Sequence, residues 1–175
     1  MSTAWYFAYG SNMQRATFAG RRGISFMRAE PARVGGWRLV FDKPPLFPVG
    51  ESYANIVPDA GTEVLGVLYE VTADDLAHID FTEGVPLGNY QRIEVPVTSL
   101  RPSSNSSQRA FTLTSERRDP QLQPSVRYMN LLIAGALEHG LPADYVDFLR
   151  AVPARPETAE AIRFRAMIDE FLQRR

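Results

Sequence analysis

The chain has 175 residues, 45% hydrophobic and 22% charged, so we expect one globular domain over residues 1–175 rather than a disordered or fibrous protein. It has no cysteine and two histidines, which excludes a thiol nucleophile or a disulfide framework and leaves little for a metal centre. With 19 basic and 20 acidic residues, the net charge of −1 gives no electrostatic reason to bind nucleic acid.

The N-terminal residues lack a cationic segment followed by an apolar one, so they do not form a signal peptide. No apolar stretch reaches the ~18 residues needed to cross a bilayer. We therefore expect a cytoplasmic protein that does not enter the membrane. The sequence does not decide between a monomer and a homodimer.

Strand patterns fill the first part of the chain. The aromatic run at residues 5–9 predicts a buried strand that ends in a Gly10-Ser11-Asn12 turn, and a weak helical stretch follows at residues 13–19. Residues 26–41 are interpreted as a hairpin that turns at Val34-Gly35-Gly36. The prolines of residues 43–48 predict a loop that is able to cover part of a pocket, because proline has no amide donor for a ladder.

Further strands are expected at residues 54–57 and 64–71, before the first clear helix. Thr72 followed by Asp75 is a weak form of the capping box and predicts a helix that runs to about Phe81. Residues 90–98 and 109–114 then alternate as a hairpin. The Ser/Asn-rich loop between them, residues 101–108, is expected to be mobile.

Helical spacing replaces the strand patterns from Ser125 onward. It predicts helices over residues 125–139 and 142–150 and a third segment that includes Ile162 and Phe171. Strands first and helices afterwards indicate the α+β class. We expect a small, mixed, mostly antiparallel sheet curled toward a barrel, with the helices packed on its outside.

Charge is distributed unevenly along the chain. Residues 15–38 hold six arginines and one acid, whereas residues 44–91 hold eight acids and neither lysine nor arginine. The simpler explanation is that the two segments are neighbours in the sheet and neutralise each other. The alternative is that clustered like charges raise the pKa of one carboxylate in the acidic segment.

Two polar loops are the candidates for chemistry. Gly10 is free to take a positive φ, so the loop Tyr9–Asn12 is able to turn consecutive amides toward an anion, although such a sequence is more often only a turn. In the second loop, Glu83 lies beside apolar residues and Gly84. Partial desolvation there would raise the pKa of the carboxyl group and suit it to general acid and base catalysis. Otherwise Glu83 is one exposed acid among twenty.

The motifs in these loops resemble the γ-glutamylcyclotransferase family in order and spacing. They are FAYGSN at residues 7–12, EVLGVLY at residues 63–69, D-x-x-E-G-V-x-x-G-x-Y at residues 80–90, P-S-x-x-Y at residues 124–128, and a helical motif at residues 135–145. The resemblance covers about residues 4–152. It leaves residues 153–175 as a C-terminal helical extension and residues 101–108 unplaced.

The resemblance implies the family fold and a set of site residues. Tyr9, Gly10, Ser11 and Asn12 would bind substrate through backbone amides, and Glu83 would be the general acid and base. Tyr90 and Tyr128 would line the γ-glutamyl pocket, with no cofactor and no metal. Phe111 occupies the position of a pocket tyrosine in relatives. The loss of this hydroxyl is expected to affect which substrates bind more than the reaction itself.

The implied reaction converts a γ-glutamyl compound to 5-oxoproline, because the α-amine attacks its own γ-carbonyl and releases the attached amine. The leaving amine is open: an amino acid, a lysine side chain, the dipeptide of glutathione or an antibiotic amine. The rival hypothesis is a non-catalytic small-molecule-binding or regulatory module of the same fold. The presence of Glu83 argues against it.

Overall fold

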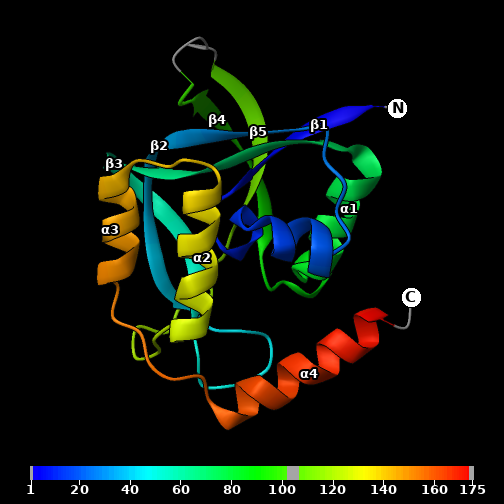
Figure 1. The fold of residues 1–175 in the computed structure, drawn as a ribbon, viewed down its shortest axis with the longest axis vertical. Coiled ribbons are helices and arrows are strands. Elements are labelled where there is room, and N and C mark those ends of the chain that lie inside the picture. Colours follow the sequence, from blue (N-terminus) through cyan, green and yellow to red (C-terminus); the bar gives the residue numbers. More distant parts are fainter. Residues whose placement is uncertain (1, 102–106, 174–175) are drawn as a thin grey trace.

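A computed structural model describes residues 2–101 and 107–173 (Figure 1). Five strands close into a barrel in the order β1-β3-β2-β4-β5. The neighbouring strands are antiparallel, except that β1 and β5 pair in parallel through Tyr6 and Phe111 and so close the barrel. The strands are β1 (Thr3–Ala8), β2 (Arg28–Lys43), β3 (Tyr53–Thr72), β4 (Gln91–Ser99) and β5 (Ser107–Thr114). The predicted α+β class and the mostly antiparallel barrel are confirmed.

Helices pack around this barrel or extend from it. In Figure 1, α2 and α3 lie side by side along the barrel, and α4 runs away from it toward the C-terminus. The predicted capping residue Thr72 accepts a hydrogen bond from the amide of Asp75, and Ser125 caps α2 by accepting one from the amide of Tyr128. The helices are α1 (Ala73–Thr82), α2 (Val126–Glu138), α3 (Ala143–Ala151) and α4 (Ala159–Gln173), with short turns at Ser11–Met13, Ala16–Arg21 and Val85–Leu87.

None of the helices in the described part of the chain is long and apolar enough to cross a membrane. The weak helical stretch expected at residues 13–19 is instead a 3-10 turn followed by a π-helical turn. Most of the loop expected at residues 101–108 lies outside the described residues. Ser107 and Gln108 belong to β5.

The hairpin expected within residues 26–41 is wrong. β2 is continuous, and it pairs along its length with β3, from Arg28 opposite Glu70 to Lys43 opposite Tyr53. Gly36 does take a positive φ of 81°, but the register shift beside it marks a bulge and not a turn. The two strands expected at residues 54–57 and 64–71 are likewise one strand. The true turn of this long hairpin contains the prolines of residues 44–48.

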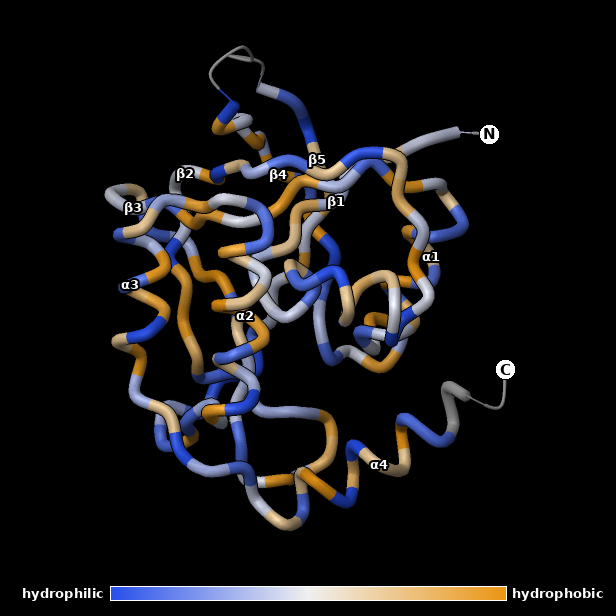
Figure 2. Tube along the Cα trace, in the orientation of Figure 1, coloured by the Kyte–Doolittle hydropathy of each residue, from blue (hydrophilic) through white to orange (hydrophobic). Residues whose placement is uncertain are grey.

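Hydrophobic residues recur along the barrel strands and supply its core (Figure 2). Phe7, Ile56, Leu68 and Tyr69 are fully buried. Strands β1 and β3 approach closely at Gly66, where a Cβ atom would lie 2.2 Å from the carbonyl oxygen of Ala8. The packing of these two strands therefore depends on glycine at position 66.

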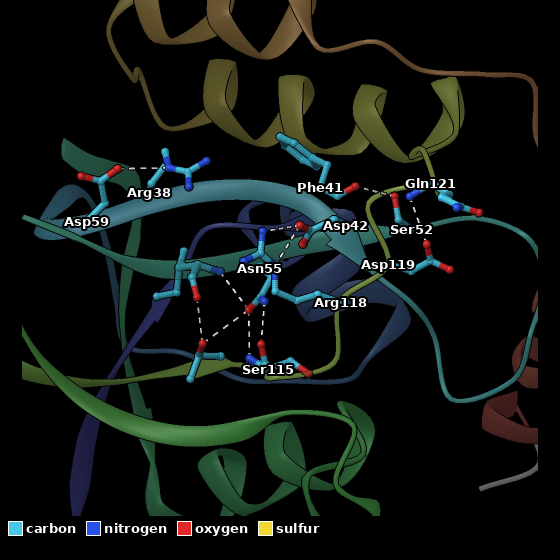
Figure 3. A network of polar contacts seen from close by, with 12 residues as sticks. Arg38, Phe41, Asp42, Ser52, Asn55, Asp59, Ser115, Arg118, Asp119 and Gln121 are labelled. Atoms are coloured by element: carbon cyan, nitrogen blue, oxygen red, sulfur yellow. Dashed lines mark hydrogen bonds and ion pairs between the residues drawn. The ribbon is translucent and has the colours of Figure 1, made fainter. Parts of the chain in front are cut away.

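A buried polar side chain fixes one end of the barrel. Asn55 donates from Nδ2 to the carbonyl oxygen of Ser115 at 2.8 Å, and its Oδ1 accepts from the amide of Ser115 at 2.9 Å (Figure 3). The Ser115 hydroxyl in turn donates to the carbonyl oxygen of Asn89 at 2.9 Å. This network ties the segment after β5 to β3 and to the segment before β4.

Ion pairs across the long hairpin explain the uneven charge. Arg28 pairs with Glu70 at 3.7 Å, Arg33 with Glu63 at 3.5 Å, and Arg38 with Asp59 at 3.1 Å. The arginine-rich and acidic segments are neighbours, as the simpler explanation predicts.

Candidate functional site

A cavity of about 400 Å³ opens at one end of the barrel. Its walls come from the loop after β1, the end of α1, the proline-rich loop, α2 and α4. The structure brings together on this cavity every site residue proposed from the sequence: Tyr9, Gly10, Ser11, Asn12, Glu83, Tyr90 and Tyr128.

Glu83 lies where α1 ends, and two side chains hold its carboxylate. Asn12 Nδ2 donates to Oε1 at 2.8 Å, although 71 residues separate the two in sequence. Arg22 Nη2 lies 3.0 Å from the same oxygen. The Glu83 side chain is 15% exposed, so it is desolvated as expected. Phe81, Gly84 and Leu87 line the same cavity, but the groups in contact with the carboxylate are the Asn12 amide and the Arg22 guanidinium.

Arg22 was missed by the sequence reasoning, although it lies in the arginine-rich segment. Helix α1 helps to place it: His78 Nε2 lies 2.9 Å from the carbonyl oxygen of Arg22, and Arg22 Nη1 donates to the Thr82 hydroxyl at 3.1 Å. The hydrogen bond of His78 therefore joins α1 to the backbone of Arg22. Arg22 lies far from Glu83 in the sequence, so no short motif could predict that the two side chains form an ion pair.

Gly10 has a different role in the loop from the expected one. Its φ of −108° is open to any residue, so the expectation of a positive φ is wrong. A Cβ atom at this position would lie 3.2 Å from the Tyr128 hydroxyl and 3.6 Å from Ala54 Cβ. Glycine is favoured here because it lets the loop approach the cavity wall closely.

The tyrosine hydroxyls of the cavity are bonded to the backbone. Tyr90 donates to the carbonyl oxygen of Ala54 at 2.9 Å, and Tyr128 accepts from the amide of Ala54 at 3.1 Å. Tyr9 donates to the carbonyl oxygen of Leu113 at 2.6 Å. Burial raises the pKa of all three phenols. They therefore form neutral walls at physiological pH.

Two polar atoms near Glu83 have no hydrogen-bond partner among the described residues. They are Asn12 Oδ1, an acceptor, and Arg22 Nε, a donor. Buried polar atoms normally have partners, so these two are exceptions beside the Glu83 carboxylate. In the described ranges 2–101 and 107–173, no group of three or more His, Asp or Glu side chains is placed to hold a metal ion.

The C-terminal helix also contributes to the cavity, which the sequence did not reveal. Phe164 of α4 lines it and packs against Phe47 of the proline-rich loop, with ring centroids 5.2 Å apart. The loop therefore contacts the pocket, as expected of it. Phe111 is not among the described residues that line the cavity, and its ring packs against the Arg92 guanidinium instead.

Comparison with known proteins identifies the class. A protein-family model described as the AIG2-like family matches residues 63–149, which include Glu83, Tyr90 and Tyr128. Gamma-glutamylcyclotransferase of Bos taurus is 32% identical over 151 residues, or 84% of this chain and 77% of the relative. The enzyme of the same name from Mus musculus is 31% identical over 156 residues, or 86% and 79%. The chain therefore belongs to the γ-glutamylcyclotransferase family.

Solved structures share this fold, among them one described as a gamma-glutamyl cyclotransferase, with a TM-score of 0.76 at 24% identity over 99% of this chain and 100% of that chain. A human protein described as uncharacterized superposes with a TM-score of 0.79 at 26% identity, over 97% of this chain and 99% of that chain. The resemblance seen in the sequence and the fold that it implied are confirmed. The expectation of an enzyme of this type is confirmed at the level of the family.

Proposed function

We propose that this protein cyclises a γ-glutamyl amino acid or amine to 5-oxoproline, with Glu83 as general acid and base. The observation that carries the proposal is the Glu83 carboxylate, oriented by Asn12 and Arg22 on the wall of a small-molecule cavity. The volume of about 400 Å³ falls within the range of ligand pockets, roughly 300–1,000 Å³.

The cavity contributes by holding the substrate bent. Nucleophile and electrophile belong to one molecule, so the protein needs to place the α-amine against the γ-carbonyl. Good alignment in such intramolecular reactions is worth about 7–11 kcal/mol. The buried phenols of Tyr9, Tyr90 and Tyr128 supply rigid walls for this conformer, because backbone hydrogen bonds fix their hydroxyls.

Glu83 then moves the protons. The carboxylate accepts a proton from the α-ammonium, which frees the amine to attack, and returns a proton to the leaving nitrogen as its bond to carbon breaks. The hydrogen bond from Asn12 Nδ2 holds Glu83 Oε1 in position for these transfers. Backbone amides of the loop Gly10–Asn12 would share the negative charge that develops on oxygen.

The first test measures 5-oxoproline release from a panel of γ-glutamyl amino acids, amines and glutathione. Glu83→Gln keeps the shape of the side chain and its ability to accept from Asn12, but cannot transfer the proton. We expect turnover to fall by about 10²-fold or more, with substrate affinity and melting temperature little changed.

Glu70→Gln is the matched control, because Glu70 also pairs with an arginine but does not line the cavity. It should leave turnover unchanged. Unimpaired release by Glu83→Gln would eliminate the mechanism. Ligand binding without 5-oxoproline from any compound would favour the binding-module alternative.

A further inference from the structure

The chain contains a single lysine, Lys43, and it is buried beside the cavity. It ends β2, is 1% exposed and lines the cavity. Its Nζ donates a hydrogen bond to Asn89 Oδ1 and lies 4.2 Å from the centroid of the Tyr90 ring. The proposed mechanism gives this ammonium group no task.

A second cation shares the same acceptor. Arg117 Nη1 donates to Asn89 Oδ1 at 3.2 Å, and its Nη2 donates to the carbonyl oxygen of Pro45 at 3.1 Å. Within the described part of the chain, neither Lys43 nor Arg117 forms an ion pair with a carboxylate. Lys43 is buried, whereas Arg117 is partly exposed and lies behind it. Buried charges are normally paired, so the ammonium form of Lys43 would be stabilised by an anion in the cavity.

We propose that Lys43, backed by Arg117, is the subsite that binds a carboxylate of the substrate. This inference rests on the proposed function, because every γ-glutamyl compound with a free α-carboxylate brings one such group. A compound whose leaving amine is an amino acid brings a second. A carboxylate suits the site because it would supply both the missing negative charge and acceptors for the ammonium group.

Asn89 sets the position of this subsite relative to Glu83. Its Nδ2 donates to the carbonyl oxygen of Glu83 at 2.9 Å, while its Oδ1 accepts from the two cations. The Asn55–Ser115 network of Figure 3 fixes the backbone of Asn89 through the Ser115 hydroxyl. The Asn89 side chain therefore links the backbone of Glu83 to the two cations of the carboxylate subsite.

The electrostatics of the ligand-free site make the charge of Lys43 sensitive to a bound anion. Burial, followed by repulsion from Arg117, lowers the pKa of Lys43 to about 7, and the attraction of Glu83 opposes this shift. Tyr90 and Asn89, the other groups in contact with Nζ, are neutral. A carboxylate bound at Nζ would stabilise the ammonium form and raise the pKa. Above pH 7 its binding should therefore take up a proton and weaken as pH rises.

A single lysine makes this measurable in the intact protein. Incorporation of ¹³C-labelled lysine gives one Cε resonance, which reports the protonation of Lys43 through a pH titration. If the subsite takes the α-carboxylate, saturating 5-oxoproline, which keeps that group, should raise the midpoint by one pH unit or more. In that case 2-pyrrolidone, which lacks the group, should leave the midpoint unchanged.

Glu83→Gln protein allows substrates to be titrated without rapid turnover, with its own ligand-free titration as the reference. A rise with a γ-glutamyl amino acid but not with γ-glutamyl methylamide or 5-oxoproline assigns the subsite to the carboxylate of the leaving amino acid. A rise with all three assigns it to the α-carboxylate. Either result supports the subsite.

Kinetics of Lys43→Met give an independent readout. We expect KM to rise by tenfold or more with kcat within a few-fold and with an unreduced melting temperature. Arg33→Met is the control, because Arg33 is an exposed cation of the same strand outside the cavity. An unmoved Lys43 resonance with ligands that demonstrably bind overturns the inference alone. Absence of both binding and 5-oxoproline release overturns the proposed function, and the inference with it.

Discussion

At the level of single residues, the backbone of Ala54 fixes two cavity tyrosines at once. Tyr128→Phe removes the acceptor of the Ala54 amide, which becomes a buried donor without a partner. We expect a loss of about 1–3 kcal/mol in the free energy of unfolding. At roughly 2–4 °C per kcal/mol for a chain of this size, the melting temperature should fall by several degrees.

Tyr53→Phe is the control for this change. The Tyr53 ring packs edge-on against Tyr128 at 5.0 Å, but its hydroxyl has no hydrogen-bond partner among the described residues. Its removal should be almost neutral in the same calorimetric measurement. Equal effects of the two variants would show that the Ala54 hydrogen bond contributes no special stability.

The sequence predicted residues within short motifs better than residues joined by tertiary contacts. Glu83 and the loop Tyr9–Asn12 carry a local signature of glycine and small polar residues, so they could be proposed in advance. Arg22 and Lys43 could not, because their significance arises from side chains 61 and 46 residues away, at Glu83 and Asn89. A lone cation in a sequence does not show whether it will be buried.

At the level of elements, helices were easier to predict than strand connections. Thr72 and Ser125 cap their helices through hydrogen bonds to residues three positions away, and the expected helices begin at or beside these positions. The turn expected at Val34–Gly36 failed because Gly-Gly serves a bulge as well as a turn. Only the pairing of β2 with β3 over its full length distinguishes the two, and such pairing is set by residues far apart in the chain.

The close approach of the paired strands β1 and β3 at Gly66 leads to a prediction at this level. Gly66→Ala would place a Cβ atom 2.2 Å from the Ala8 carbonyl oxygen and 2.8 Å from the Phe7 ring, so the strands must separate. We expect a destabilisation at or above the upper end of the roughly 1–3 kcal/mol typical of overpacking. Chemical denaturation followed by circular dichroism would measure it.

Gly35→Ala in the same hairpin is the matched control, since no atom lies within 4 Å of its added Cβ. This variant should unfold at nearly the wild-type denaturant concentration. A Gly66→Ala protein as stable as Gly35→Ala would mean that the two strands can separate at little cost.

At the level of the whole molecule, the fold buries its tyrosines, both in the barrel and in the helices packed on it. Burial raises the pKa of every one of the seven tyrosines in the chain above its ordinary value. The unfolded chain would ionise them near pH 10. Above that pH the folded state therefore binds more protons than the unfolded state, so stability must fall as pH rises.

Each tyrosine that ionises only on unfolding removes about 1.4 kcal/mol of stability by pH 11, and more beyond it. Seven such groups would remove about 10 kcal/mol, comparable to the roughly 5–15 kcal/mol total stability of a typical domain. We expect cooperative alkaline unfolding between about pH 11 and 12. Tyrosinate absorbance at 295 nm and loss of the circular dichroism signal should then appear in one step. Gradual ionisation centred near pH 10, with the circular dichroism unchanged, would show that the phenols ionise within the folded barrel and would contradict their burial.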